Sequence, residues 1–296
     1  MIYIKSSRDA KPILRELIED SNTYMVPGVY NPFTALLAEK MGFKAIYLSG
    51  AALTGSLAMP DLGLITLSEL TFFTKYIARA VDIPLLVDAD TGFGEVLNVA
   101  RAVRELEDAG ASAIQIEDQV LPKKCGHLRG KQLINPIDMA RKIRSAVSAR
   151  RSRDFLIIAR TDARNVSSLE DALERSKLYV EAGADIIFPE ALESIDEFRV
   201  FVEEIDAPIL ANMTEFGRTP YISYKEFRDV GVKFIIYPVT IFRGNARNTL
   251  DILKSLREYG GQEPFLEDLM TRKEFYDLIG YSRYEDFDEE LSRWKP

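Results

Sequence analysis

Short apolar runs alternate eight times with longer stretches of amphipathic periodicity along this chain. The runs are apolar at consecutive positions, as in strands that a parallel sheet buries on both faces. They predict strands at about residues 23–27, 44–49, 84–90, 112–117, 154–160, 185–189, 207–212 and 233–238. The amphipathic stretches predict helices at about residues 33–41, 68–81, 95–109, 136–149, 169–182, 194–204, 223–230 and 245–258.

A glycine marks the passage from helix to strand at four of these junctions. Gly42, Gly110, Gly183 and Gly231 each follow an amphipathic stretch and precede an apolar run. Glycine adopts the left-handed backbone conformation that closes many helices at little cost. The repeated junction indicates that one unit, a strand followed by a helix, recurs along the chain.

Eight such units predict an α/β fold, the (β/α)8 TIM-type barrel. The competing fold is a doubly wound open sheet, but no Gly-x-Gly-x-x-Gly follows the first predicted strand. No linker of biased composition interrupts residues 1–296, so we expect a single domain. A further amphipathic helix is predicted at about residues 8–20, with Leu14, Leu17 and Ile18 on one face.

The tail at about residues 262–296 lies outside the eight units. Its apolar positions predict extra C-terminal helices: Phe265, Leu269, Phe275, Leu278 and Ile279. Apolar side chains of this kind need a surface to pack against, and a neighbouring subunit could provide it.

Composition restricts the classes of function. The formal net charge of −8 and the pI near 5.0 argue against nucleic acid or an anionic membrane as the main partner. No run approaches the ~20 apolar residues of a membrane span, and the N-terminus lacks the apolar region of a signal peptide. A single cysteine excludes an internal disulfide and fits a reducing compartment, so we expect a cytoplasmic enzyme or binding protein.

Polar side chains follow the predicted strands at their carboxyl ends, the face where barrels of this type place their chemistry. The strand ends include Tyr47-Leu48-Ser49-Gly50-Ala51, Asp88-Ala89-Asp90, Glu117-Asp118, Arg160-Thr161-Asp162, Phe188-Pro189-Glu190 and Asn212-Met213-Thr214. The eighth strand leads to Arg243. We therefore predict that acids, amides, hydroxyls and arginines converge on one rim.

Asp88 and Asp90 are two positions apart at a strand end, so their side chains are predicted to point the same way. Two close carboxylates need a cation or a shared proton. Mg²⁺ or Mn²⁺, held by one or two carboxylates and water, is the expected solution, with Asp61 and Glu117 as outer acceptors. A solvated aspartate pair that caps the next helix is the alternative. One histidine and one cysteine make a zinc site improbable on composition.

The only cysteine and the only histidine, Cys125 and His127, are two positions apart. The cationic residues of this segment are Lys123, Lys124, Arg129 and Lys131. Positive charge lowers the pKa of a thiol, so we expect Cys125 to exchange a proton near neutral pH. The glycines of the segment predict a flexible, solvated loop. An inert cysteine in a basic surface loop is the alternative.

Two arginines are predicted to lie on the same acid-lined rim. Arg160 and Arg243 would serve as clamps for a substrate that bears carboxylates. A phosphate-bearing substrate is disfavoured because the chain has no glycine-rich phosphate loop. As an alternative, both arginines would be surface ion-pair partners without a ligand.

These residues resemble the isocitrate lyase/phosphoenolpyruvate mutase superfamily and, within it, the short-chain methylisocitrate lyases. The resemblance covers about residues 10–285. The segments that carry it are Tyr47-Leu48-Ser49-Gly50, Asp88-Ala89-Asp90-Thr91-Gly92-Phe93-Gly94, Ile116-Glu117-Asp118-Gln119, Lys123-Lys124-Cys125-Gly126-His127, Ala159-Arg160-Thr161-Asp162, Phe188-Pro189-Glu190, Asn212-Met213-Thr214-Glu215-Phe216-Gly217 and Tyr237-Pro238.

The resemblance implies a role for each matching residue. Mg²⁺ would bind Asp88 and Asp90, with Asp61 and Glu117 reaching its waters, and Cys125 would be the catalytic acid/base, tuned by His127. The implied substrate contacts are Ser49, Gly50, Ala51, Gly126, Arg160, Glu190, Asn212, Thr214, Arg243 and Arg272. It also implies a homotetramer with a swapped C-terminal helix.

The implied reaction is a Mg²⁺-dependent retro-aldol cleavage of 2-methylisocitrate to pyruvate and succinate, a step of propionate catabolism in the methylcitrate cycle. Tyr47 is our candidate for the base that removes the 2-hydroxyl proton. Phe188 and Ile236 would form the wall beside the substrate methyl group, where isocitrate lyases carry a larger tryptophan in place of Phe188.

Three alternatives to this reaction stay open. Leu128-Arg129-Gly130-Lys131 is closer to isocitrate lyase, so isocitrate is an alternative substrate. An oxaloacetate- or phosphonate-cleaving relative is another possibility within the superfamily. A barrel that binds dicarboxylates without catalysis is the third, and the intact set of cysteine, aspartates and arginines argues against it.

Overall fold

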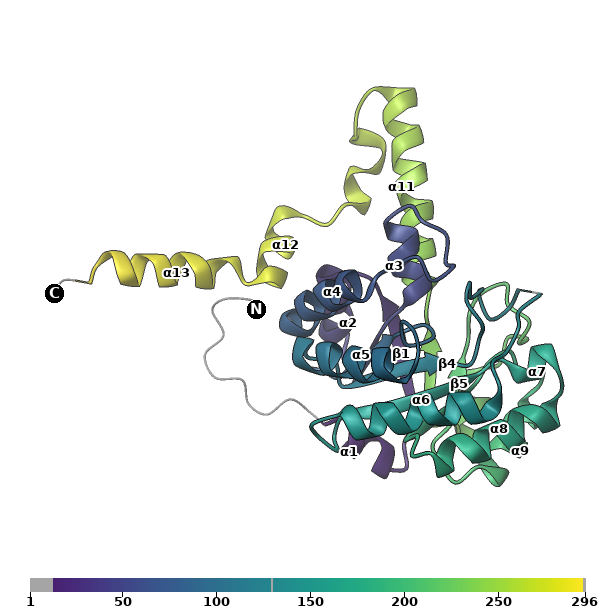
Figure 1. Ribbon diagram of the computed structural model, residues 1–296. Coiled ribbons are helices and arrows are strands. Elements are labelled where there is room, and N and C mark those ends of the chain that lie inside the picture. Colours follow the sequence, from purple (N-terminus) through teal and green to yellow (C-terminus); the bar gives the residue numbers. More distant parts are fainter. Residues whose placement is uncertain (1–12, 129, 295–296) are drawn as a thin grey trace. The chain divides into compact units, whose positions relative to one another are not determined.

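The computed structural model describes residues 13–128 and 130–294 of the 296 in the sequence (Figure 1). The described chain divides into two compact units, with the boundary between residues 242 and 243. The larger one carries every predicted strand.

Eight parallel strands form the centre of the larger unit. They are β1 (Tyr24–Val29), β2 (Ile46–Leu48), β3 (Leu85–Asp88), β4 (Ala113–Glu117), β5 (Leu156–Thr161), β6 (Ile186–Pro189), β7 (Leu210–Asn212) and β8 (Phe234–Tyr237). The hydrogen-bonded order is β6-β5-β4-β3-β2-β1-β8-β7. A bridge between Ile187 and Ile209 joins β6 to the start of β7, so the sheet closes into the predicted (β/α)8 barrel.

The helices between the strands match the predicted periodicity. They are α2 (Pro32–Lys40), α4 (Leu67–Ala80), α5 (Val96–Ala109), α6 (Pro136–Ala149), α8 (Leu169–Glu181), α9 (Ile195–Glu204) and α10 (Tyr224–Val230). Two short helices, α3 (Gly50–Ser56) and α7 (Ala163–Val166), were not predicted because each begins directly at a strand end. Of the helix expected at 8–20, α1 (Leu14–Glu19) is present, and residues 8–12 lie outside the described chain.

The four junction glycines confirm their prediction. Gly42, Gly110, Gly183 and Gly231 have φ between 87° and 101°, the left-handed region. Each helix thereby ends and turns directly into the next buried strand.

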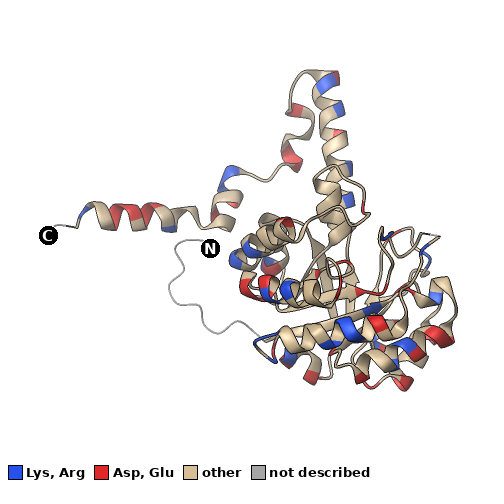
Figure 2. Cartoon of the chain, viewed as in Figure 1, with Lys and Arg blue, Asp and Glu red and all other residues tan. Residues whose placement is uncertain are grey.

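Two apolar layers hold the barrel together. Residues that point inward from the strands, among them Leu86, Ile158 and Phe234, form one buried cluster, with Leu14 of α1 also part of it. Outward-pointing strand residues pack against the helices in a second, larger cluster. Figure 2, a cartoon coloured by residue type, shows most Lys, Arg, Asp and Glu residues on the helices. Inward- and outward-pointing residues alternate along each strand because successive side chains of a strand point to opposite faces.

The helices of the smaller unit are α11 (Thr240–Tyr259), which begins in the barrel unit, α12 (Arg272–Ile279) and α13 (Tyr281–Ser292), with a 3₁₀ segment at Glu263–Asp268. The predicted C-terminal helices are therefore present. Within these four described segments no residue is buried, and large apolar side chains such as Leu253 and Phe287 are 57% and 45% exposed. Throughout the part of the chain that the structure describes, no helix is long and apolar enough to cross a membrane.

Candidate active site

Asp88 and Asp90 place their carboxylates on the same side at the end of β3. Asp88 Oδ1 accepts hydrogen bonds from Gln115 Nε2 at 3.1 Å and from the backbone N–H of Asp90 at 3.2 Å. A Cβ atom built at Gly50 would lie 2.9 Å from Asp88 Oδ2 and 3.6 Å from Asp90 Oδ1. The two carboxylates thus border a space that only glycine at position 50 leaves open.

The backbone of Asp90 is left-handed, with φ of 48°. This conformation is unfavourable for residues other than glycine, and it concentrates at functional sites. Asp90 therefore deviates from the regular strand end that the alternation of side chains predicts.

A buried lysine enters this acidic region. Lys123 Nζ forms an ion pair with Asp61 and lies 2.7 Å from Asp90 Oδ1, yet that oxygen has no well-directed hydrogen bond among the described residues. Burial raises the pKa of Asp90 to about 6, with Lys123 opposing the rise and Asp88 adding to it. The Lys123 pKa is raised far above its ordinary range, because four carboxylates outweigh the effect of burial.

Glu117, at the end of β4, is buried with one oxygen unsatisfied. Its Oε2 lies 3.3 Å from Arg160 Nε, while its Oε1 has no hydrogen-bond partner in the described chain. Burial raises its pKa well above the ordinary value despite the opposing charges of Arg160 and Lys123. A buried oxygen without a partner is costly, so this atom needs a further ligand or a proton.

We call Asp61, Asp88, Asp90 and Glu117 the carboxylate cluster. Among the described residues no three Asp, Glu, His or Cys side chains form a ready-made metal cage. Mg²⁺ does not require one, because it keeps several waters and binds through one or two carboxylates. Four carboxylates face one ammonium here, and two of their oxygens lack directed hydrogen bonds. The donor set therefore fits a hard cation such as Mg²⁺.

Arg160 is surrounded by three carboxylates. It donates to Asp162 from Nε at 3.0 Å and from Nη2 at 3.2 Å, and its Nη1 lies 3.2 Å from Glu190 Oε2. Glu117 is the third carboxylate, and the guanidinium lies 5.2 Å from the ring centroid of Phe188. These contacts fix the orientation of the predicted clamp at the rim.

The cysteine loop, described at residues 122–128 and 130–131, packs on this arginine at Gly126. A Cβ atom at Gly126 would lie 2.4 Å from Glu190 Cγ and 2.5 Å from Arg160 Nη2, so glycine alone permits this approach. Lys131 is almost fully buried and binds both the Gly126 carbonyl and Asp162. The predicted solvated loop is therefore wrong for these residues, since the charged side chains of Lys123 and Lys131 face inward.

The predicted lowering of the Cys125 pKa is also wrong. Burial raises the pKa of the thiol, and the negative charge of Glu190 adds to the rise. The backbone N–H of His127 and the charge of Arg160 oppose it without reversing it. Lys123 and Lys131 are paired with carboxylates, and Lys124 Nζ donates to the Gly130 carbonyl. The positive charge of the loop therefore does not outweigh the effect of burial on the thiol.

His127 is held on both ring nitrogens. Nδ1 accepts the backbone N–H of Arg218 at 2.9 Å, and Nε2 lies 3.1 Å from Glu190 Oε1. Because a backbone N–H can only donate, Nδ1 must be unprotonated and Nε2 carries the proton. Burial opposes ionisation of Glu190, but Arg160 and the bond from His127 lower its pKa.

Tyr47 is buried, and its hydroxyl donates to Gln115 Oε1 at 2.6 Å. Burial raises its pKa well above the ordinary value, and Asp88 adds to this effect. A neutral phenol of this kind is a poor proton acceptor. The geometry instead links Tyr47 through Gln115 to Asp88.

The remaining predicted contacts occupy the same rim or the barrel interior. Ser49 caps α3, Asn212 donates to Glu190 at 3.2 Å, and its own oxygen lacks a partner among the described residues. Phe188 and Ile236 belong to one buried cluster inside the barrel. Ala51 and Thr214 follow β2 and β7. Arg243 and Arg272 belong to the unit of residues 243–296, so their part in the site stays a prediction.

Four residues of this network had not been assigned a role from the sequence. Lys123 and Lys131 had counted only as loop charges, while Gln115 and Asp162 had no role. Gln115 was detectable as a polar residue in an otherwise apolar strand, two positions before Glu117. Asp162 was detectable as an acidic residue directly after a strand, two positions after Arg160.

Comparison with known proteins agrees with this geometry. A family model described as phosphoenolpyruvate phosphomutase matches residues 14–257. The 2-methylisocitrate lyase of Aeropyrum pernix is 64% identical over 281 residues, covering 95% of this chain and 91% of the relative. The 2-methylisocitrate lyase of Bacillus subtilis is 50% identical over 94% of this chain and 92% of its own length.

The chain belongs to the methylisocitrate lyase family of this superfamily. It is an enzyme of the lyase class, which excludes the non-catalytic barrel. Among solved structures, 2,3-dimethylmalate lyase superposes with a TM-score of 0.88 at 32% identity over 97% of this chain and 96% of that one. Phosphonopyruvate hydrolase, in a complex with oxalate and Mg²⁺, does so with a TM-score of 0.85 at 30% identity over 95% and 98%.

Proposed function

We propose that this enzyme cleaves 2-methylisocitrate to pyruvate and succinate in a Mg²⁺-dependent retro-aldol reaction. The observation that carries the proposal is that the cysteine loop and the carboxylate cluster both lie against Arg160 and its neighbours at the carboxyl ends of the strands. Relatives named for this activity align over nearly the whole chain. We also propose the cytoplasmic location and the role in propionate catabolism that the sequence led us to expect.

Asp88 and Asp90 would hold the metal, and Asp61 and Glu117 would accept hydrogen bonds from its waters. Glu117 Oε1, which has no partner in the described chain, and Asp90 Oδ1, which has the ion pair with Lys123 but no directed hydrogen bond there, support this assignment. The Mg²⁺ in the complex of phosphonopyruvate hydrolase is a further argument within the superfamily. When bound, Mg²⁺ would supply Lewis acidity that lowers the pKa of the substrate's 2-hydroxyl group.

The chain's own groups account for both proton transfers. A base accepts the 2-hydroxyl proton, the C2–C3 bond breaks with its electrons on C3, and C2 becomes the keto carbon of pyruvate. The Cys125 thiol then donates its proton to the carbanion, which becomes succinate. A raised thiol pKa keeps Cys125 protonated at neutral pH, as an acid requires.

The environment of Glu117 suits the base better than that of Tyr47. Glu117 has a free oxygen and a raised pKa in the cluster, whereas the Tyr47 hydroxyl is donated to Gln115. We therefore assign the proton acceptance to Glu117, directly or through one water. Tyr47 orients Asp88 through Gln115.

The remaining rim residues would bind the substrate carboxylates. Arg160 is already oriented by three carboxylates, and Gly126 brings the loop main chain against it. The other proposed contacts are Ser49, Gly50, Ala51, Glu190, Asn212, Thr214, Arg243 and Arg272. Arg243 and Arg272 enter this set on family resemblance alone.

Phe188 and Ile236 would form the apolar wall beside the substrate methyl group. Burial of one methyl contributes about 1 kcal/mol, or several-fold in kcat/KM. The test is a parallel assay of the purified protein with Mg²⁺ on 2-methylisocitrate, isocitrate and oxaloacetate. We expect the highest kcat/KM for 2-methylisocitrate, and Phe188→Trp should reduce that reaction more than isocitrate cleavage. A wild type that prefers isocitrate or oxaloacetate would overturn the proposal.

We further propose a homotetramer with the C-terminal helices packed on a second copy. The apolar side chains of α11, α12 and α13 support it, because none is buried within the described chain. Light scattering after size-exclusion chromatography would give the mass. A monomer at micromolar concentration would contradict this assembly.

A further inference from the structure

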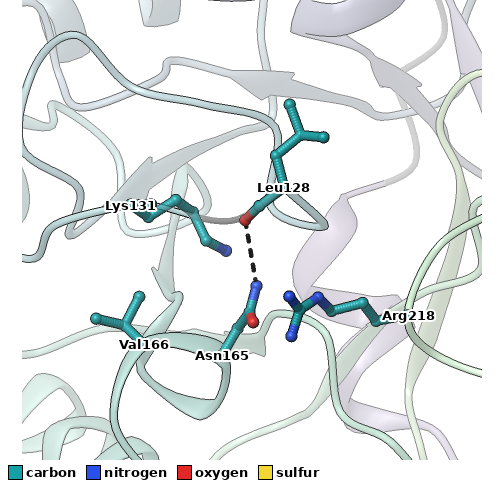
Figure 3. A pocket seen from close by; sticks show the side chains of 6 residues that line it. Leu128, Lys131, Asn165, Val166 and Arg218 are labelled. Carbon is teal, nitrogen blue, oxygen red and sulfur yellow. Dashed lines mark hydrogen bonds between the residues drawn. The ribbon is translucent and has the colours of Figure 1, made fainter.

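A cavity lies behind the cysteine loop. It has a volume of about 330 Å³ and is lined by Leu128, Gly130, Lys131, Asn165, Val166 and Arg218. Figure 3 shows the side chains of Lys131, Asn165 and Arg218 directed toward this space from three segments of the chain. Asn165 comes from α7, after β5, and Arg218 from the segment after β7.

Three consecutive carbonyls of the loop accept hydrogen bonds from these side chains. The Gly126 carbonyl accepts from Lys131 Nζ and from Asn165 Nδ2, the latter at 3.1 Å. The His127 carbonyl accepts from Arg218 Nε at 3.3 Å, and the Leu128 carbonyl from Asn165 Nδ2 at 3.5 Å. Within the described chain, Leu128 N–H closes a turn on the Cys125 carbonyl, and the carbonyls of residues 126–128 are held by side chains.

Arg218 also acts on the histidine ring. Its backbone N–H binds His127 Nδ1, and this leaves the Nε2 proton for Glu190. The approach is close, since a Cβ atom at Gly217 would lie 2.9 Å from His127 Cε1. The segment after β7 thus fixes both the carbonyl and the ring orientation of His127.

We propose that Asn165 and Arg218 are positioning residues that hold Cys125 against the site before substrate binds. Both act through the main chain of the loop, Asn165 on the Gly126 and Leu128 carbonyls and Arg218 on the His127 carbonyl. The inference rests on the proposed function in one respect, the role of Cys125 as the proton donor. The geometry of the loop itself does not depend on which substrate is cleaved.

Loss of either side chain leaves a loop carbonyl without its donor and favours an open loop in which water replaces that donor. Opening exposes Cys125 and moves its thiol away from the substrate. The strand-end groups that bind substrate, such as Arg160, stay in place. Of the proposed substrate contacts, Gly126 moves with the loop. The expected signature is therefore a fall in kcat that exceeds the rise in KM, together with faster modification of the thiol.

The test uses the full-length enzyme and the variants Asn165→Leu, Arg218→Met and their combination. Leucine has the shape of asparagine without the donor, and methionine keeps the Arg218 backbone N–H. Val166→Ala is the matched control, because Val166 lines the same cavity without a hydrogen bond to the loop. The rate of Cys125 carboxamidomethylation by iodoacetamide is measured without substrate, beside kcat and KM.

We expect modification to be about fivefold faster in each single variant and more than tenfold faster in the double, with kcat reduced by similar factors. KM should rise by a smaller factor than that by which kcat falls, and Val166→Ala should behave as the wild type. Wild-type modification rates in Asn165→Leu or Arg218→Met overturn the proposal, as does a lower kcat without faster modification. A wild type that fails to cleave 2-methylisocitrate overturns the proposed function alone, because the modification rates still decide the role of the loop contacts.

Discussion

Glu117 and Asp118 are consecutive buried carboxylates at the end of β4, yet their surroundings are opposite. Asp118 accepts hydrogen bonds from the backbone N–H of Asp162 at 3.0 Å, the Thr161 hydroxyl at 2.8 Å and the Tyr179 hydroxyl at 2.9 Å. Arg175 Nη1 lies 3.3 Å away. Glu117 has an arginine at the same distance on Oε2, Arg160 at 3.3 Å, but no partner on Oε1 within the described chain.

This difference indicates a structural role for Asp118 and a chemical role for Glu117. A buried carboxylate whose donors are all present holds elements together, here β4, β5 and α8. A buried carboxylate with unmatched oxygens is costly to the fold and persists where a ligand completes it. Burial raises the pKa of both residues, so the pKa alone does not distinguish them. The two residues differ in whether each carboxylate oxygen has a hydrogen-bond partner in the described chain.

The largest expected effect tests the carboxylate cluster as a metal site. Asp88→Asn removes one charged ligand, and we expect kcat/KM to fall by at least about a thousandfold, roughly 4 kcal/mol of lost transition-state stabilisation. Chelation of the wild type by EDTA should cause a similar loss, reversed by Mg²⁺ or Mn²⁺. The assay follows pyruvate release.

The melting temperature of Asp88→Asn without metal provides the control. It should equal or exceed that of the wild type, because removal of a charge from a repulsive cluster does not destabilise the fold. Turnover that survives chelation would contradict the metal assignment.

The second prediction compares the neighbouring residues directly. Asp118→Asn leaves Arg175 and two hydroxyl donors poorly matched, so we expect a loss of about 3 kcal/mol of stability and a melting temperature lower by about 6 °C or more. Glu117→Gln should leave the melting temperature within about 2 °C but reduce kcat by about a hundredfold, as expected for an acid/base group. Thermal melting by circular dichroism and kcat give the two readouts. The reverse pattern would invert our assignment of the two carboxylates.

The fold and the location of the site follow from the sequence for local reasons. Strand and helix periodicities are properties of neighbouring residues, and in this fold the position of a strand end determines the rim. The pairing of Lys123 with Asp61, or of Lys131 with Asp162, joins residues far apart in the chain. Without these pairs the loop would be a cluster of free positive charge, and this explains the wrong direction predicted for the Cys125 pKa.

The third prediction removes a single donor from the satisfied carboxylate. Tyr179→Phe deletes the hydroxyl that donates to Asp118 and leaves the ring in place. One hydrogen bond to a charged group contributes about 1.5 kcal/mol, so the melting temperature should fall by about 3–6 °C. The kcat should stay within about twofold of the wild type, since Asp118 keeps its other donors. A larger fall in kcat than in stability would place Asp118 in the chemistry.

The smallest expected effect is a shift in the pH dependence of thiol modification. Burial raises the Cys125 pKa above its ordinary value of 9.0, with Glu190 adding to the rise. Only the thiolate reacts with iodoacetamide, so the modification rate should climb through pH 8 and 9 and reach its midpoint above that of N-acetylcysteine in the same buffer. Glu190→Gln removes the second contribution and should move the midpoint downward while burial keeps it above the ordinary value. A wild-type midpoint below that of N-acetylcysteine would mean that the pKa of Cys125 is lowered, as the charges of the loop suggested. Cys125 would then be more ionised near neutral pH and less suited to donate a proton to the carbanion.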